Sequence, residues 1–305
     1  IVMFSSLLIF TCLVYFVLIM KKVQTGQVTK FYSNSCLVKT HAFELECLAI
    51  KNVVVGDNVE VEIIQDSKKL LGKILKIKTR STVISKKYRN KENFFAANIT
   101  HVGLLMSPKP NTSSEFIDKW ILKTKLSNIK SFIVNNKIDM ECDSTYIEKI
   151  NIYKKINMKI INISAKYEDN LEELKNYIKN KSILFVGNSG AGKSTLTSKI
   201  IGQNLKTNNL SNDQGVHTTS VSSLYEISGD TKIIDSPGMR DIEILEYPAK
   251  KIIYGFKEIL ELSKGCKFNN CNHINNEGCN VIKGLEDGVL SKSRYNNFIK
   301  FRDGQ

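Results

Sequence analysis

The sequence has few of the residues that mark fibrous, linker-rich or disulfide-rich proteins. Its 305 residues include only 4 Pro and 17 Gly, which excludes collagen-like and proline-rich architectures. The 7 Cys are an odd number spread along a long chain, which argues against a small secreted disulfide scaffold and indicates a reducing compartment. No internal repeat period is visible, which excludes a solenoid. The 42% hydrophobic and 24% charged residues that remain are typical of a globular protein.

Arginine is scarce, although the chain is strongly basic. Basic residues number 44 against 30 acidic ones, a net charge of +14, and nearly all of the basic residues are lysine. Part of this lysine excess reflects the codon usage of an AT-rich genome. The excess is nevertheless uneven, because residues 182–250 carry 6 basic and 7 acidic residues. A basic surface elsewhere indicates a polyanionic partner, either nucleic acid or an anionic membrane.

The first twenty residues carry no charge and are followed by Lys21 and Lys22. Twenty apolar residues can span a bilayer, so residues 1–20 can be interpreted as a membrane anchor. A signal peptide fits less well, because no basic region precedes the run and no small-residue cleavage site follows it. We favour a third interpretation, in which translation starts at Met20 and residues 1–19 are an apolar leader absent from the mature protein.

Residues 20–85 contain about five short runs of alternating polar and apolar residues, separated by turn signals such as Gly56-Asp57-Asn58. This spacing predicts a small all-β domain, an OB-type barrel of the kind that binds oligonucleotides. An SH3-like barrel fits the spacing almost as well. We interpret residues 86–98 as a basic linker.

From about residue 97 to residue 235, candidate strands alternate with candidate helices. Strands are expected at 99–106, 129–134, 159–163, 183–187, 220–227 and 231–235, and helices at 113–125, 144–152, 170–178 and 192–202. This alternation predicts a mostly parallel, doubly wound α/β domain over residues 86–248. Residues 249–305 are expected to form a C-terminal domain of short helices around a Cys/His cluster.

A phosphate-binding loop follows the apolar strand expected at 183–186. The motif is Gly187-Asn188-Ser189-Gly190-Ala191-Gly192-Lys193-Ser194-Thr195. Glycines let backbone N–H groups converge on a phosphate at the start of a helix, where the helix dipole favours anions. We expect Lys193 to contact the β- and γ-phosphates and the Ser194 hydroxyl to bind Mg²⁺.

Asp235-Ser236-Pro237-Gly238 ends a later strand and matches D-x-x-G. The Asp235 carboxylate is expected to hold the Mg²⁺ shell through water, and the Gly238 N–H to contact the γ-phosphate.

Two further motifs predict guanine recognition. Asn136-Lys137-Ile138-Asp139 matches N-K-x-D, and Ser164-Ala165-Lys166 follows the next strand. A carboxylate at Asp139 can accept hydrogen bonds from the N1–H and 2-amino group of guanine, which adenine does not offer. Asn136 is expected to bond the base edge, Lys137 to cover its face and the Ala165 N–H to reach O6. Together with the phosphate loop, these residues predict GTP and GDP as ligands rather than ATP.

Gln214-Gly215-Val216-His217-Thr218-Thr219 lies where a switch I loop belongs. Thr219, or alternatively Thr218, is the candidate ligand of Mg²⁺ and the γ-phosphate. Met239 occupies the position after D-x-x-G where Ras-like proteins have a water-orienting Gln, so we predict slow intrinsic hydrolysis. His217 is the candidate substitute, with Lys193 and Thr219 as the other catalytic residues.

Three cysteines and one histidine lie within fourteen residues near the C-terminus. They are Cys266, Cys271, His273 and Cys279. Four N/S donors in one short loop suit a closed, structural Zn²⁺ site. Cys36, Cys47 and Cys142 are isolated and are expected to be small buried apolar residues.

The base-recognition motifs precede the phosphate loop, which reverses the order found in Ras-like GTPases. A circular permutation explains this, because it keeps the site while moving the termini.

The OB-type barrel, permuted GTPase motifs and zinc ligands, in this order, resemble the ribosome small-subunit-dependent GTPase A family. Ala96-Ala97-Asn98-Ile99-Thr100 is also similar to the family, and the resemblance runs from about Met20 to Arg302. It implies a cytoplasmic, monomeric late maturation factor that binds the 30S subunit and 16S rRNA rather than DNA, with its GTPase stimulated by the subunit. A large-subunit permuted GTPase and a membrane-tethered regulatory GTPase are the alternatives.

Overall fold

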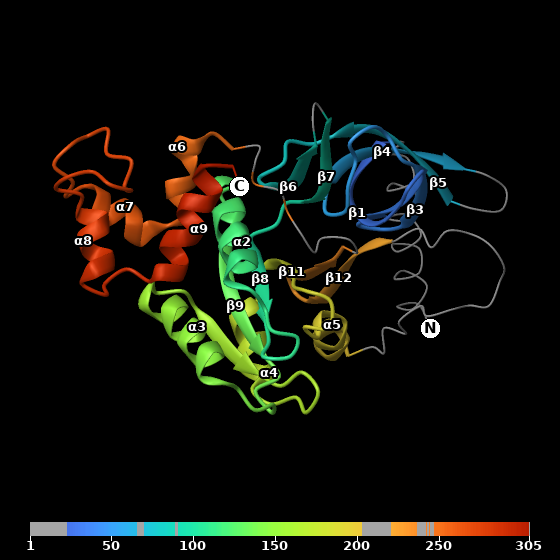
Figure 1. The fold of residues 1–305 in the computed structure, drawn as a ribbon. Helices are drawn as coiled ribbons and strands as arrows, with labels where there is room; N and C mark the ends of the chain where they lie inside the picture. Colours follow the sequence, from blue (N-terminus) through green and yellow to red (C-terminus); the bar gives the residue numbers. More distant parts are fainter. Residues whose placement is uncertain are drawn as a thin grey trace, which may run out of the picture.

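The computed structural model describes residues 23–65, 70–88, 91–202, 221–236, 242, 244 and 247–304 (Figure 1). The apolar leader at 1–19, the candidate switch residues His217, Thr218 and Thr219, and Gly238 lie outside the described residues. Over the part of the chain that is described, no helix has both the length and the apolar character needed to cross a membrane.

The N-terminal strands form a closed barrel. They are β1 (Val23–Tyr32), β2 (Ser35–Thr40), β3 (Glu44–Leu48), β4 (Asn58–Gln65) and β5 (Leu70–Ile77). β1 pairs with both β2 and β4, while β3 and β5 pair in parallel, so the strand order β1-β2-β3-β5-β4 returns to β1. Because alternate residues point inward, Val28, Val38 and Val61 are fully buried inside the barrel. This order is that of an OB-type barrel and excludes the SH3-like alternative.

The interpretation of residues 86–98 as a linker is wrong. β6 (Val83–Tyr88) and β7 (Lys91–Ala97) pair as an antiparallel hairpin, from Val83 opposite Ala97 to Tyr88 opposite Lys91. Ile84 and Ala96 are fully buried in the same apolar cluster as the sheet of the next module. The described part of this segment is therefore a paired hairpin packed against the sheet rather than a linker.

The central module has the predicted alternation of strands and helices. Its strands are β8 (His101–Met106), β9 (Lys130–Asn136), β10 (Ile160–Ile163), β11 (Ser182–Val186), β12 (Ser222–Ser228) and β13 (Thr231–Asp235). Its helices are α2 (Ser114–Leu126), α3 (Ser144–Lys155), α4 (Leu171–Ile178) and α5 (Lys193–Ile201). β10, β9, β8, β11 and β13 are parallel neighbours in that order. β12 pairs antiparallel with β13, on the side of β13 away from β11. The P-loop α/β prediction is confirmed.

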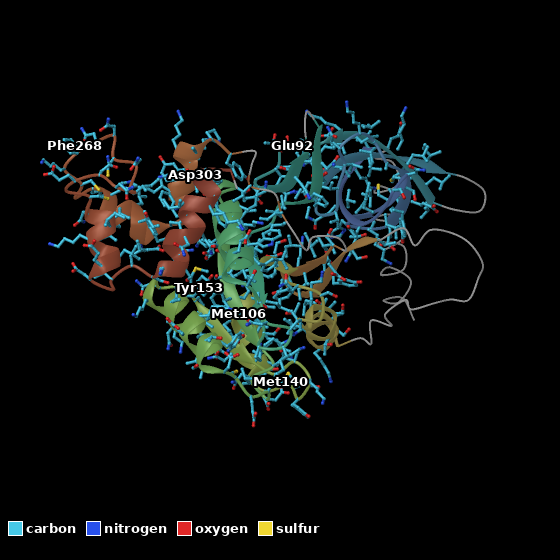
Figure 2. The ribbon with its side chains drawn as sticks, in the orientation of Figure 1. Glu92, Met106, Met140, Tyr153, Phe268 and Asp303 are labelled. Atoms are coloured by element: carbon cyan, nitrogen blue, oxygen red, sulfur yellow. The ribbon has the colours of Figure 1, made fainter. Side chains whose placement is uncertain are left out.

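Apolar residues cover both faces of this sheet, as a doubly wound fold requires. On one face, Leu104 of β8, Trp120 of α2 and Tyr153 of α3 are fully buried in one apolar cluster. On the other face, Leu105 packs with residues of α4 and α5, including Leu174 and Leu196. Figure 2 places Met106 and Tyr153 inside this module.

The barrel and the central sheet form one continuous sheet. β12 pairs antiparallel with β1 through Lys30 opposite Ser223 and Phe31 opposite Ser222. The Lys232 ammonium also donates to the Gln27 side-chain oxygen at 2.7 Å, and Lys39 forms an ion pair with Glu226. The barrel is thus joined directly to the two strands that follow the phosphate loop.

The C-terminal module consists of short helices. They are α6 (Ala249–Ile252), η1 (Ile253–Gly255), α7 (Lys257–Ser263), α8 (Asn280–Glu286) and α9 (Lys292–Arg302). Phe256, Phe298 and Phe301 form its core, together with Leu122 of α2. Figures 1 and 2 show this module beside α2, with Phe268 at its outer edge. The predicted helical domain around the Cys/His cluster is confirmed.

Candidate nucleotide site and metal centre

The nucleotide motifs converge on one edge of the central sheet. The phosphate loop follows β11, N-K-x-D follows β9, Ser164-Ala165-Lys166 follows β10, and Asp235 ends β13. The carboxyl ends of parallel strands meet at the same edge, so motifs separated by about a hundred residues become neighbours. A cavity of about 450 Å³ lies at this edge, lined by Lys137, by most of the phosphate loop and by Asp235.

Two glycines give the phosphate loop its shape. Gly190 and Gly192 have φ values of +78° and +93°, a region that side chains disfavour. A Cβ on Gly192 would also lie 2.3 Å from Nδ2 of Asn136. Gly192 immediately precedes α5, whose first N–H groups have no acceptor within the helix. The loop therefore presents backbone donors to the cavity at a helix N-terminus, an arrangement that binds phosphate.

Asn136 connects the three loops of the site. Its side chain is 1% exposed; its Nδ2 donates to the Ala191 carbonyl at 2.9 Å and its Oδ1 accepts from the Ala165 N–H at 3.0 Å. The Ala165 N–H, expected at guanine O6, is therefore already bonded to protein in this structure. Asn136 holds the base-recognition loops against the phosphate loop, a role that the sequence pattern did not reveal.

The Asp139 carboxylate is held in place by a neighbouring motif. The Ser164 hydroxyl donates to its Oδ1 at 2.6 Å, and the Ser164 backbone N–H donates to the Asp169 carbonyl. Lys137 has a φ of +65°, and its ammonium donates to the Lys109 carbonyl at 2.6 Å. Asp139 is exposed, so its carboxylate is accessible to a ligand.

Lys193 and Asp235 lie together at the phosphate end of the cavity. The Lys193 ammonium is 3.8 Å from the Asp235 carboxylate, and both side chains are partly exposed. Ser194 and Thr195 are exposed on the first turn of α5. Behind them, the Ser222 and Ser236 hydroxyls are 3.0 Å apart, which joins β12 to the end of β13. A cation, a hydroxyl and a carboxylate therefore line one wall, a donor set suited to phosphates and Mg²⁺.

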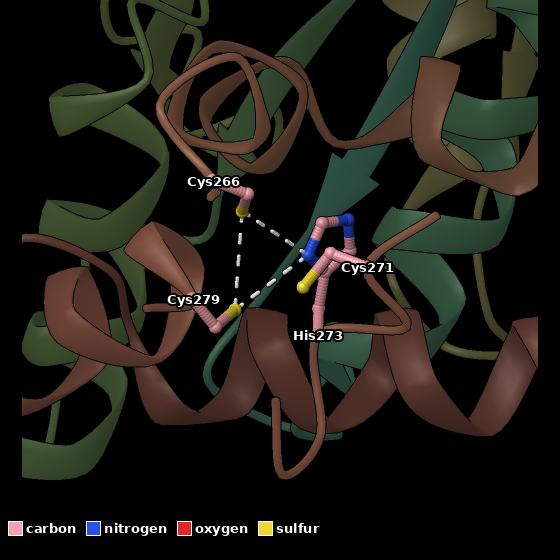
Figure 3. A group of neighbouring side chains, drawn as sticks. All are labelled: Cys266, Cys271, His273 and Cys279. Carbon is pink, nitrogen blue, oxygen red and sulfur yellow. Dashed lines mark hydrogen bonds between the residues drawn. The ribbon is translucent and has the colours of Figure 1, made fainter. Parts of the chain in front are cut away.

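The predicted zinc ligands come together in one cluster (Figure 3). The donor atoms of Cys266, Cys271, His273 and Cys279 all lie within 4.8 Å of one another. Cys266 and Cys279 have their sulfurs 4.0 Å apart, and each sulfur is 3.7 Å from Nδ1 of His273. Tetrahedral zinc with bonds of about 2.3 Å to sulfur and 2.0 Å to nitrogen separates its ligands by roughly 3.5–3.8 Å. The two sulfur–nitrogen separations lie in this range and the sulfur–sulfur separation is slightly longer, so the cluster is close to the size of a zinc site.

Local contacts shape the metal-binding loop. His273 has a φ of +61°, and its carbonyl accepts from the Tyr295 hydroxyl at 2.7 Å, which ties the loop to α9. Burial lowers the pKa of His273 and raises that of Cys271 to about 11. A neutral imidazole is the form that binds metals, and a cation among the thiols would reverse the second shift.

The isolated cysteines divide into two kinds. Cys36 and Cys47 are buried in the barrel, as predicted. Cys142 is exposed near the N-K-x-D motif, so its predicted burial is wrong. It lies in the loop between β9 and α3, where no core element covers it.

Comparison with protein-family profiles matches residues 77–245 to the RsgA GTPase family. The chain is 35% identical over 262 residues to the small ribosomal subunit biogenesis GTPase RsgA of Flavobacterium psychrophilum, which covers 83% of this chain and 80% of that protein. The chain belongs to the RsgA GTPase family. Its nucleotide site is therefore that of a GTPase, and the family implies a guanine nucleotide and Mg²⁺ as ligands.

Further RsgA proteins and solved structures cover nearly the whole chain. The RsgA protein of Chlorobaculum tepidum is 27% identical over 93% of this chain and 99% of its own. The crystal structure of YjeQ from Thermotoga maritima superposes with a TM-score of 0.70 at 27% identity, covering 92% of this chain and 98% of that one. YloQ, described as a circularly permuted GTPase, has a TM-score of 0.68 at 22% identity, covering 93% of this chain and 95% of its own, and shares the fold. The RsgA fold, with its permuted motif order, thus accounts for barrel, GTPase and helical modules together.

Proposed function

We propose that this protein hydrolyses GTP during late maturation of the small ribosomal subunit, binding 16S rRNA and responding to the 30S particle. The observation that carries this proposal is the convergence of four GTPase motifs on one sheet edge, in a chain of the RsgA family whose relatives are named for small-subunit biogenesis. The OB-type barrel and the basic charge supply a surface for RNA phosphates. Cytoplasmic location and a monomeric state are part of the proposal.

We propose the following roles in the nucleotide site. Asp139 recognises the guanine N1–H and 2-amino group, with its carboxylate oriented by Ser164 at 2.6 Å. Lys137 covers the base, and the backbone of the 164–166 loop faces O6. Because the Ala165 N–H is donated to Asn136, the Lys166 N–H is the amide better placed to serve O6.

At the phosphate end, the backbone of Gly187–Thr195 surrounds the β-phosphate and Lys193 moves from Asp235 to the β- and γ-phosphates. The Ser194 hydroxyl and the Asp235 carboxylate, the latter through water, would hold Mg²⁺, with Thr219 or Thr218 as a further ligand. Bound Mg²⁺ supplies charge neutralisation between the β- and γ-phosphates. Gly238, Thr218, Thr219 and His217 lie outside the described residues, so their roles rest on the motif alone.

Zn²⁺ is proposed as a structural ion held by Cys266, Cys271, His273 and Cys279. All four donors belong to the protein, which leaves no position for substrate. The ion would fix the loop between α7 and α8, which protrudes beyond the helical core and offers a second surface for the particle.

The decisive experiment measures GTP turnover by the full chain with and without purified 30S or 50S particles. We expect slow turnover by the protein alone, stimulation by 30S and none by 50S. Stimulation by 50S alone, or by neither particle, would contradict the proposal. His217→Ala is expected to reduce the 30S-stimulated rate while leaving GDP affinity unchanged, and an unchanged stimulated rate would remove His217 from the catalytic set.

A further inference from the structure

A second large cavity lies at the edge of the central sheet opposite the nucleotide cavity. Its volume is about 1220 Å³, more than twice that of the nucleotide cavity. One wall is formed by the amino ends of the parallel strands and the ends of α2 and α4; the other is formed by η1 and α7 of the C-terminal module. We call this the amino-edge cleft. The nucleotide motifs contribute nothing to it, so the proposed function does not explain it.

Three lysines and His101 lie at the amino ends of four adjacent strands in the amino-edge cleft. His101 begins β8 and lies opposite Lys130, the first residue of β9. Lys159 directly precedes β10, and Lys181 directly precedes β11. Strands are spaced about 4.8 Å apart, so these side chains form a row along the sheet edge. Burial, and after it the positive charges of Lys181 and Lys130, lower the pKa of His101 to about 4, so the lysines carry the positive charge of this row.

Aromatic rings are interleaved with this row. Tyr177, at the end of α4, has the Lys181 ammonium 4.5 Å and the Lys159 ammonium 5.8 Å from its ring centroid. The His101 ring meets the same tyrosine edge-on at 6.2 Å. On the opposite wall, Tyr254 of η1 is 47% exposed. One cleft therefore contains an exposed ring and a row of lysines. Bases can stack on such a ring while the lysines contact phosphates.

Three asparagines repeat the same local design around the amino-edge cleft. Asn128, Asn157 and Asn180 each lie one residue beyond the C-cap of a helix and have a left-handed φ between +56° and +59°. Each is followed within two residues by one of the lysines that head a strand. All three side chains are exposed, so their amides can donate to and accept from base edges.

The carboxylates of the amino-edge cleft are already paired. Glu258 accepts from Arg294 at 2.7 Å and 3.1 Å, and Glu261 forms an ion pair with Lys264 at 2.6 Å. By contrast, Lys125, Lys130 and Lys257 have no ion pair among the described residues. The lining therefore carries unpaired positive charge that an anionic ligand would neutralise.

We propose that the amino-edge cleft binds single-stranded RNA, separately from the barrel. Lysines alone would accept any polyanion, including an acidic peptide. The exposed tyrosine and the three asparagine amides favour RNA, since they complement the faces and edges of unpaired bases. The proposal rests on the proposed function only in taking the RNA of the small subunit as the natural ligand. It requires neither GTP hydrolysis nor contact with the 30S particle.

The test uses a fluorescein-labelled, unstructured 12-nucleotide RNA and the full chain with GDP, followed by anisotropy over a series of salt concentrations. Lys130→Glu/Lys159→Glu is expected to weaken binding at least tenfold and to reduce the slope of log affinity against log salt by about 1.4, for two lost phosphate contacts. Lys154→Glu/Lys250→Glu is the matched control, because both lysines are exposed, carry the same charge and lie outside the cleft. Tyr254→Ala is expected to weaken binding roughly fivefold or more, through lost stacking.

Ultraviolet cross-linking of the same RNA locates it on the protein. A cross-link to the peptide carrying Tyr254, lost in the Lys130→Glu/Lys159→Glu variant, supports the proposal. Cross-links confined to the barrel or the zinc loop, or equal slopes for the cleft and control variants, overturn it. Full competition by poly-glutamate at equal charge would assign the cleft to an acidic protein and also overturn it.

Since basal GTP turnover and 30S stimulation are measured separately, failure of the RNA-binding proposal leaves the proposed function standing. If Lys130→Glu/Lys159→Glu does not keep the wild-type melting temperature, Lys125→Glu/Lys257→Glu takes its place with the same expected result.

Discussion

At the scale of single residues, the motifs predicted which residues come together more fully than which contacts those residues make. Residue type and spacing predicted Asp139, Lys193 and Asp235 at a nucleotide site; Lys193 and Asp235 line the cavity, and Asp139 is hydrogen-bonded to Ser164. The same reasoning assigned Asn136 to the base, whereas its buried amide bonds two protein loops. A sequence pattern specifies which group is present, but the partner of a buried amide depends on which loops the sheet brings together.

The Ser164–Asp139 hydrogen bond predicts a measurable effect on guanine affinity. Ser164→Ala removes a 2.6 Å bond to a carboxylate, which leaves the carboxylate free to rotate away from the base. Hydrogen bonds to charged groups contribute about 1.5–3 kcal/mol, so we expect affinity for GDP to fall roughly tenfold or more. Titration with fluorescent GDP measures this, with Ser127→Ala at the end of α2 as control. Wild-type affinity in Ser164→Ala together with lost binding in Asp139→Ala would mean that Asp139 needs no orienting partner.

His101 predicts a specific pH dependence of stability. Burial and the neighbouring Lys181 and Lys130 lower its pKa from 6.5 to about 4, so the folded protein binds its proton less readily than the unfolded chain does. The stability contributed by neutral His101 is therefore fully present above about pH 6.5 and is lost as the pH falls towards 4. The loss amounts to about 2–3 kcal/mol.

Urea unfolding of the wild type and of His101→Gln between pH 7 and pH 4.5 isolates this contribution, because groups common to both proteins cancel in the difference. We expect the wild type to lose more stability than the variant over this range. Parallel pH profiles would show that the imidazole is protonated as easily in the folded state as in the unfolded state.

At the scale of elements, the sequence predicted the types of strands and helices well and their long-range pairing poorly. The alternation of apolar residues located β8 to β11 and α2 to α5 within a few residues. The hairpin of β6 and β7 was missed because its lysine-rich sequence resembles a linker. Ile84 and Ala96 are buried only because the hairpin packs against the sheet. The pairing of β1 with β12 joins residues nearly two hundred positions apart, a choice made by the whole fold rather than by local pattern.

The metal-binding loop between α7 and α8 predicts that metal and local structure are lost together. Three thiols and an imidazole this close have little reason to stay together without a cation, since thiolates repel one another. We expect one Zn²⁺ per chain by elemental analysis and a lower melting temperature after chelation. Cys279→Ser should lose the metal, whereas Cys142→Ser, at an exposed cysteine outside the cluster, should keep it. A metal-free preparation with an unchanged melting temperature would refute a structural zinc site.

At the scale of the whole molecule, the modules are joined by two very different contacts. The barrel is attached through backbone pairing of β1 with β12, supported by partly exposed polar contacts. The C-terminal module is attached through a buried charge network between Asp118 of α2 and Arg294 of α9, whose side chains are 0% and 1% exposed. Asp118 also accepts from Tyr153 at 2.8 Å and Asn297 at 2.7 Å. These partners are far apart in the sequence, so no local motif predicted the network.

Because this network lies away from the nucleotide cavity, we expect that changing it can alter the position of the C-terminal module without altering GDP binding or basal GTP turnover. Arg294→Met leaves Asp118 buried without its cation, and removing one partner of a buried pair costs about 3–5 kcal/mol. Asp118→Leu/Arg294→Met removes both members of this pair and should recover part of that loss, as urea unfolding would measure; the recovery is incomplete because Glu258 loses its hydrogen bonds from Arg294. Since Asp118 and Arg294 lie away from the nucleotide cavity, the double variant should bind GDP like the wild type. If the module must be held at a fixed angle to engage the particle, 30S stimulation of the double variant falls while its basal turnover stays unchanged. Full 30S stimulation in a stable double variant would instead mean that apolar packing of Phe256, Phe298 and Leu122 alone fixes the module.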